Sequence, residues 1–168
     1  MSITMYSASS PRLANALKNL SECLSKAEAN ATARKIDPAV FLTSRLAPDM
    51  FALTRQVQIA CDVAKGGVAR LAGVEVPKHE DTEQSFADLQ QRIAKVIAFI
   101  ESIPAEQING TEERSISLKI AGVETTFRGL QYLMGFVWPN VHFHTAMTYA
   151  ILRHNGVDLG KKDFLGSI

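Results

Sequence analysis

The chain has 168 residues, of which 46% are hydrophobic and 21% charged, and its formal net charge is +1. These totals are typical of one globular domain over 1–168 with a sizeable core. A nearly neutral chain has no overall field to attract nucleic acid or an anionic membrane. The N-terminus lacks a signal-peptide pattern, and no apolar run is long enough to span a bilayer. We therefore expect a cytoplasmic protein with no nucleic-acid or membrane partner.

Helical signals dominate the first hundred residues. Ser10-Pro11 is typical of a helix start, and apolar residues then recur at helical spacing to about Ala33. The same reasoning predicts a short helix over 38–43, a long helix from about Pro48 to Gly73, and another from about Ser85 to Pro104. Along the first of these helices the repeating apolar residues are Leu13, Leu17, Leu20 and Leu24.

The hydrophobic period changes between about 114 and 128. Apolar and polar residues alternate on both sides of Ala121-Gly122, which predicts a β-hairpin. A two-residue loop would place Lys119 opposite Glu124 and Ile116 opposite Phe127. Because Ala-Gly is not the favoured turn dipeptide, a bulge is also compatible with the pattern.

The last long helix is predicted from Gly129 to Asn155, with an interruption at Pro139 and a stop at Gly156. The tail over 157–168 is expected to pack on the outside through its apolar residues, Leu159, Phe164 and Leu165. Four long helices with a hairpin before the last predict an all-α fold, a four-helix bundle with a small β-hairpin.

Histidines gather at the start of the last helix, so we tested a metal site there by geometry. His142 and His144 would point about 160° apart, and His154 lies about 15 Å beyond His144. No His-x-x-x-His spacing occurs, so further ligands must come from other helices. Asp49, expected in the first turn of the second long helix, is the best such candidate. With His144 it would form a partial metal site or an acid–base pair, and Thr148 lies one turn further along.

Simpler interpretations compete with this one. Asp49 would also be favourable as a charge at a helix N-terminus, and His144 as a buried imidazole that is hydrogen-bonded across helices. Trp138, His142 and Tyr149 would line a ligand pocket or fill the bundle.

A polar stripe, two catalytic motifs and the two cysteines also bear on possible chemistry. A polar stripe on the second long helix favours a solvated face, and a polar network under the hairpin or at a subunit contact is the alternative. We assign no catalytic residue, because a phosphate loop and a nucleophile elbow are both absent. Cys23 and Cys61 are expected to be reduced, buried thiols. The stripe consists of Arg55, Gln58, Asp62 and Lys65.

Four segments together resemble an uncharacterised bacterial family that is grouped with the DinB/YfiT-like superfamily. They are Leu46–Phe51, Arg55–Asp62, Tyr149–Val157 and Gly160–Gly166. The resemblance covers nearly the whole chain. It implies an up-down-down-up four-helix bundle, often dimeric.

The resemblance also implies chemistry. Many DinB-like proteins bind zinc or nickel through three histidines, one at the start of the second helix and two as His-x-x-x-His on the last. Some members are thiol-dependent transferases or isomerases, and others are damage-inducible with no known reaction. In this sequence the matching positions are interpreted as Asp49, His144 and Thr148, which is an incomplete ligand set.

Two functions are therefore open. One is a metal or small-molecule site centred on Asp49 and His144. If the protein with this site is an enzyme, the resemblance implies a metal-dependent thiol transferase or isomerase. The other is a non-catalytic binding or stress-response module that acts as a homodimer. The helix that carries Leu13 to Leu24 is one face that such a dimer would use.

Overall fold

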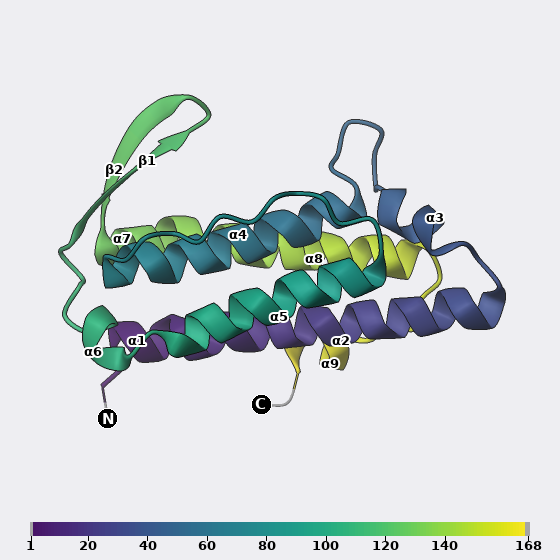
Figure 1. The fold of residues 1–168 in the computed structure, drawn as a ribbon, viewed down its shortest axis with the longest axis horizontal. Coiled ribbons are helices and arrows are strands. Elements are labelled where there is room, and N and C mark those ends of the chain that lie inside the picture. The colour runs from purple at the N-terminus through teal and green to yellow at the C-terminus, as the bar shows by residue number, and fades with distance from the viewer. Residues whose placement is uncertain (1, 167–168) are drawn as a thin grey trace.

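A computed structural model describes residues 2–166 and has four long helices that form a bundle, with a hairpin at one end (Figure 1). The long helices are α2 (Ser10–Arg34), α4 (Leu53–Ala72), α5 (Phe86–Ser102) and α8 (Trp138–His154). The short ones are α1 (Met5–Ala8), α3 (Pro38–Thr43), α6 (Ala105–Ile108), α7 (Gly129–Tyr132), the π-helical η1 (Leu133–Val137) and α9 (Lys161–Leu165). The strands are β1 (Ser115–Ile120) and β2 (Val123–Arg128). The helical bundle with a small hairpin before its last long helix is confirmed.

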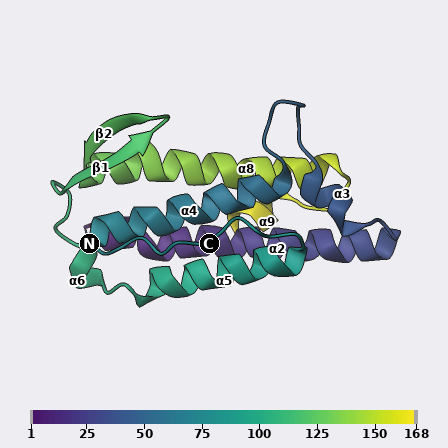
Figure 2. The same ribbon diagram turned by 45° about the horizontal axis from the view of Figure 1, so that its top comes forward.

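The helices α2 and α8 run in one direction, and α4 and α5 run in the other (Figures 1 and 2). This is the up-down-down-up order that the family resemblance implies. Between the two parallel neighbours α4 and α5 the chain must return along the whole bundle. Residues 74–85, here called the crossing segment, make that return along α4.

The apolar stripe of α2 lies inside the bundle. Leu13, Leu17 and Leu24 have no exposed surface, and Leu20 is only 4% exposed. Burying each such side chain contributes about 1.5–3 kcal/mol to folding. Because this stripe is already covered by the other helices, it is not a free face for a second copy of the chain.

The hairpin has the predicted register. Lys119 lies opposite Glu124 and Ile116 opposite Phe127, and the pairing runs without a bulge to the turn. Both turn residues have positive φ, 48° at Ala121 and 86° at Gly122, which the two-residue turn requires. The turn geometry therefore overrides the poor preference of alanine for this conformation.

The second long helix starts later than predicted. The Met50 amide donates to the Ala47 carbonyl (3.0 Å), so Pro48 occupies the second position of a tight turn. The Leu53 amide then closes the loop on the Ser44 carbonyl (2.9 Å). Proline favours both helix starts and this turn position, and here the turn is the one that forms.

Pro139 does not break the last helix. The Trp138 amide donates to the Leu133 carbonyl, five residues back, which is the π-helical bond of η1. This wider turn accommodates the missing N–H of Pro139, and the side-chain amide of Asn140 donates to the Phe136 carbonyl (2.7 Å). The predicted interruption is therefore a local widening of a continuous helix.

The tail packs beside α2 through α9. Leu159 is 3% exposed and Phe164 is partly buried, as predicted, but Leu165 is 43% exposed. The Asn19 side chain donates to the Phe164 carbonyl (3.3 Å), and Lys26 pairs with Asp163 (2.6 Å). The last two residues of the predicted tail, 167–168, lie outside the described residues.

Candidate functional site

His144 is buried between α8 and α4, with 8% of the residue exposed. Its Nδ1 lies 2.7 Å from Oε1 of Gln56, in the first turn of α4. The Gln56 side-chain nitrogen donates to the Phe51 carbonyl (3.1 Å), so Oε1 is the acceptor and Nδ1 carries the proton. Burial, and then the charge of Arg55, lower the pKa of His144. Both effects favour the neutral ring.

Thr148 lies one turn further along α8 and has no exposed surface. Its hydroxyl donates to the His144 carbonyl (3.0 Å). Gln56, His144 and Thr148, here called the core polar cluster, thus each have a hydrogen-bond partner within the cluster or at a nearby carbonyl. That is how buried polar groups are tolerated in a core.

Asp49 is not part of this cluster. It lies in the exposed loop between α3 and α4, in the turn that Pro48 begins, rather than in the first turn of α4. The polar side chain that α4 presents to His144 is Gln56. The predicted place of Asp49 in the first turn of the helix is therefore wrong, because α4 starts five residues after Pro48, and the partner shown for His144 is Gln56 rather than Asp49.

A cleft of about 860 Å³ runs between α2 and α8 and is closed at one end by α9. Trp138, His142 and Tyr149 line it, whereas Thr148 lies on the face of α8 that packs against α4. Three of the four residues singled out as pocket candidates thus share one wall. The facing wall is the side of α2 that carries Arg12, Asn15, Ala16, Asn19, Leu20 and Cys23.

The two ends of the cleft are fixed by contacts between distant segments. At one end the Trp138 indole donates to the Ala8 carbonyl (3.0 Å) and stacks on the His142 ring at 4.9 Å between centroids. At the other end the Tyr149 hydroxyl donates to the Leu159 carbonyl (3.3 Å), and its ring meets that of Phe164 at 5.9 Å. These aromatic groups form a preorganised wall.

The cysteine in the cleft is not set up as a nucleophile. The Cys23 thiol points to the Asp163 carbonyl, with Sγ 3.7 Å from the oxygen. Burial, and then the charge of Asp163, raise the pKa of this thiol to about 11. Because the thiolate is the reactive form, Cys23 stays unreactive at neutral pH. Cys61 is also free and fully buried, and burial raises its pKa to about 12.

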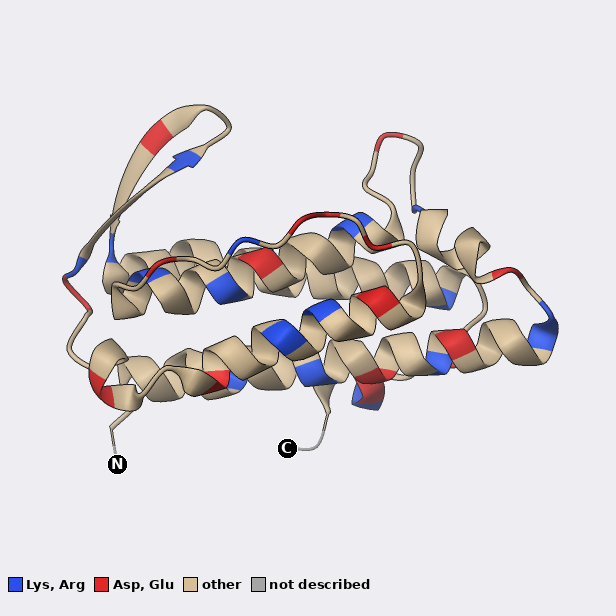
Figure 3. Cartoon of the chain, viewed as in Figure 1, with Lys and Arg blue, Asp and Glu red and all other residues tan. Residues whose placement is uncertain are grey.

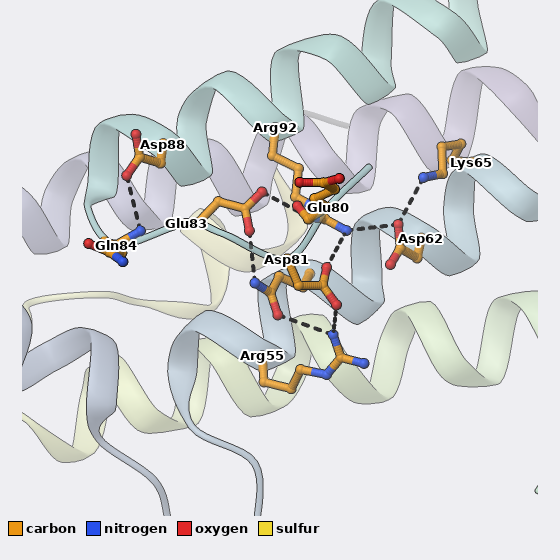
Figure 4. A network of polar contacts seen from close by, with 10 residues as sticks. Arg55, Asp62, Lys65, Glu80, Asp81, Glu83, Gln84, Asp88 and Arg92 are labelled. Atoms are coloured by element: carbon orange, nitrogen blue, oxygen red, sulfur yellow. Dashed lines mark hydrogen bonds and ion pairs between the residues drawn. The ribbon is translucent and has the colours of Figure 1, made fainter. Parts of the chain in front are cut away.

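The polar stripe of α4 belongs to a buried network (Figure 4). Arg92 on α5 is 3% exposed and contacts Asp62 (2.9 Å), Asp81 (3.0 Å) and Glu83 (2.9 Å). Gln58 donates to Glu83 (2.8 Å). The network joins α4, α5 and the crossing segment, so it fixes the path of that segment.

The network corrects the solvated-face interpretation. Gln58 and Lys65 are buried, at 5% and 3% exposed, and Lys65 pairs with Asp62 (2.9 Å). A polar network does form, as in the predicted alternative, but it lies under the crossing segment rather than under the hairpin. Arg92, which lies between Leu89 and Val96 beside the apolar stripe of α5, was not singled out from the sequence.

A known family and a solved structure are similar to this chain. The family model described as a domain of unknown function, DUF1993, matches residues 5–165. The chain belongs to this family. A solved structure, that of a DinB family member from Shewanella denitrificans, is 42% identical to it, with a TM-score of 0.88. The match covers 97% of this chain and 92% of the Shewanella chain, so the DUF1993 chain has a DinB-like fold. No curated protein matches.

The core polar cluster stands where DinB-like proteins are expected to hold their metal. Gln56 is at the start of the second long helix, and His144 and Thr148 have the i, i+4 spacing on the last one. An amide, one imidazole and a hydroxyl are a poor donor set for zinc or nickel, which favour imidazole and thiolate. Within residues 2–166 no group of three or more His, Cys, Asp or Glu could hold a metal ion. The residues of this DUF1993 chain therefore do not fit the three-histidine metal.

Among the described helices of this DUF1993 chain, none combines the length and the apolar character that crossing a bilayer requires.

Proposed function

We propose that this protein is a non-catalytic binding module whose small-molecule ligand occupies the cleft between α2 and α8. The main support is the cleft itself, because its volume of about 860 Å³ is typical of a site for a small organic molecule. Its aromatic wall offers a large contact area at little entropic cost, because the Trp138 and Tyr149 rings are held by their own hydrogen bonds.

The chemistry of the nearby groups favours binding over catalysis. The Cys23 thiol in the cleft is held protonated. His144, the buried imidazole, uses its Nδ1 proton for Gln56. A metal-dependent thiol transferase would need a ligand set that Gln56, His144 and Thr148 do not supply.

Binding is expected to be visible in the fluorescence of Trp138, the single tryptophan of the sequence. The neutral dye Nile red should bind saturably and quench this emission. Ala16→Phe fills the cleft and should weaken binding about tenfold or more. The matched control is Ala94→Phe on the exposed side of α5, which should bind as the wild type does. Absence of saturable binding, or equal binding by Ala16→Phe, would show that the cleft is not the site.

Homodimer formation is a second proposal, and the outer face of α8 favours it. From Gly129 to Leu152 the sequence contains no Asp, Glu, Lys or Arg. A helix that is apolar on all sides is normally covered on all sides. On the outer face of α8, Phe143 is 52% exposed, and Ala146, Met147 and Ala150 are partly exposed. An uncharged surface suits an uncharged partner, and in a two-fold dimer that partner is the same face of a second copy.

The helix alone is too small for a stable interface. It offers a strip of roughly 25 Å by 10 Å, about 250 Å², against about 800 Å² per partner in stable dimers. The hairpin and the loop between α3 and α4 project beyond α8 at its two ends and carry charges of both signs (Figures 2 and 3). A two-fold axis across α8 would bring Lys119 and Glu124 of one copy near Arg45 and Asp49 of the other.

Sedimentation tests the dimer. The wild type should sediment as a dimer at micromolar concentration, and Met147→Lys should shift it to a monomer by placing a charge in the interface. Ala98→Lys on the exposed side of α5 is the control and should remain a dimer. A wild-type monomer at that concentration would refute the proposal.

A further inference from the structure

The cleft has two chemically different ends. Because α2 and α8 run in the same direction, their early residues lie together and so do their late ones. The early end holds Arg12, with Trp138 fixed beside it through the Ala8 carbonyl. The late end holds Cys23 and Tyr149, next to α9. Any ligand that spans the cleft therefore meets a charged end and an uncharged end.

At the late end three polar side chains of the wall are engaged with backbone carbonyls. The Tyr149 hydroxyl donates to the Leu159 carbonyl, the Asn19 amide to the Phe164 carbonyl, and the Cys23 thiol points to the Asp163 carbonyl. What these side chains turn toward the cleft is ring and aliphatic surface. An alkyl or aryl group can cover it without stranding a donor or acceptor.

At the early end a cation lacks a counter-ion. Arg12 makes no ion pair within the described part of the chain, and its Nε alone donates, to the Ser7 carbonyl (3.3 Å). Among residues 2–166, no aspartate or glutamate lines the cleft. Asp163 lies beside the opposite end and is paired with Lys26. The terminal N–H groups of the guanidinium remain as a fork that matches a carboxylate.

His142 adds a donor at the same end. Its ring is exposed and stacked on Trp138, and one ring nitrogen carries a proton even in the neutral form. The distance from Arg12 to Cys23 along α2 is eleven residues, roughly 16 Å. That length suits an extended medium-chain group rather than a compact metabolite.

We propose that the cleft takes a free, elongated amphipathic carboxylate, with its carboxylate on Arg12 and His142 and its apolar chain toward Tyr149 and Phe164. This inference rests on the proposed function and adds the chemical class and the orientation of the ligand. It commits to a dissolved carboxylate monomer, not to a lipid surface.

The test compares three probes with the same chain and different heads: decanoate, decanol and decyltrimethylammonium, each below its micelle concentration. Titration calorimetry and Trp138 fluorescence should show that decanoate binds about tenfold tighter than decanol. This is the gain in affinity that one charge-assisted hydrogen-bonded pair provides. The cationic probe should bind weakest. Arg12→Gln should remove the preference for decanoate while leaving decanol unchanged, and Arg12→Lys should restore part of it.

Controls distinguish a cleft that does not prefer carboxylates from a cleft that does not bind small molecules at all. Arg45→Gln changes an exposed arginine in the loop between α3 and α4 and should leave the preference intact. Equal affinity for decanoate and decanol, or a preference that survives Arg12→Gln, would overturn the inference while Nile red binding upholds the cleft as a site. Tighter binding to decanoate vesicles than to the monomer would also overturn it. Loss of all probe binding, Nile red included, would overturn the proposed function as well.

Discussion

Replacing Arg92 by alanine is expected to lower the free energy of unfolding by about 3 kcal/mol. The guanidinium is buried and holds Asp62, Asp81 and Glu83 at 2.9–3.0 Å. Removing it strands the buried Glu83 with Gln58 as its remaining side-chain partner. The value lies at the lower end of the range for broken buried pairs, because the side chains of Asp62 and Asp81 are 39% and 40% exposed and can be rehydrated. Urea unfolding followed by circular dichroism measures the loss.

Lys18→Ala is the matched control. It removes the Lys18–Glu101 pair, whose side chains are both more than half exposed. Such surface pairs contribute about 0–1 kcal/mol, so this variant should unfold close to the wild type. Equal losses in the two variants would mean that the Arg92 network does not hold the crossing segment in place.

The same network gives an acid dependence with a definite sign. Burial would raise the pKa of Glu83, but hydrogen bonds from Arg92 and Gln58 outweigh it and hold the pKa below its ordinary value of 4.5. A lowered carboxyl pKa stabilises the fold above the unfolded-state value and loses that contribution as pH falls through the folded-state value. Wild-type stability should therefore decline below about pH 4.5. The Arg92→Ala variant should lose less stability over the same pH range, because the main group that lowers the pKa of Glu83 is gone.

The sequence predicted the elements whose signals are local. Alternating side chains and a two-residue loop were sufficient for the register that pairs Lys119 with Glu124. The start of α4 was misplaced because Pro48 satisfies two local rules equally well, and long-range packing selects the turn. The π-helical turn before Pro139 was missed because a widened helix retains the same apolar pattern.

The site was harder to predict because it depends on contacts between helices. The partner of His144 depends on where α4 begins, and with its start at Leu53 rather than near Pro48 the first turn presents Gln56 to the imidazole instead of Asp49. Arg92 was overlooked because a charge beside an apolar stripe resembles an exposed residue until its three acidic partners are brought together by the fold. Two of those partners come from the crossing segment, which carries no periodic signal.

The second large effect is a gain of metal binding. Gln56→His with Thr148→His should create, with His144, the three-histidine set that DinB-like proteins are expected to use. Gln56 already reaches His144 at 2.7 Å, and Thr148 has the i, i+4 spacing at which two histidines on one helix face bind zinc. Without metal the larger side chain at the fully buried position 148 should cost about 1–3 kcal/mol. Zinc or nickel at a hundred times Kd should restore about 2.7 kcal/mol.

Metal content after dialysis and the shift of Tm with added metal are the two measurements. The doubly substituted protein should retain about one ion per chain, and the wild type should retain much less than one. Adding His144→Ala to the double variant is the control, because loss of the central imidazole should abolish both signals. If the double variant binds no metal although it folds, positions 56, 144 and 148 do not converge as their hydrogen bonds indicate. The correspondence between the core polar cluster and the three-histidine ligand set would then lose its structural basis.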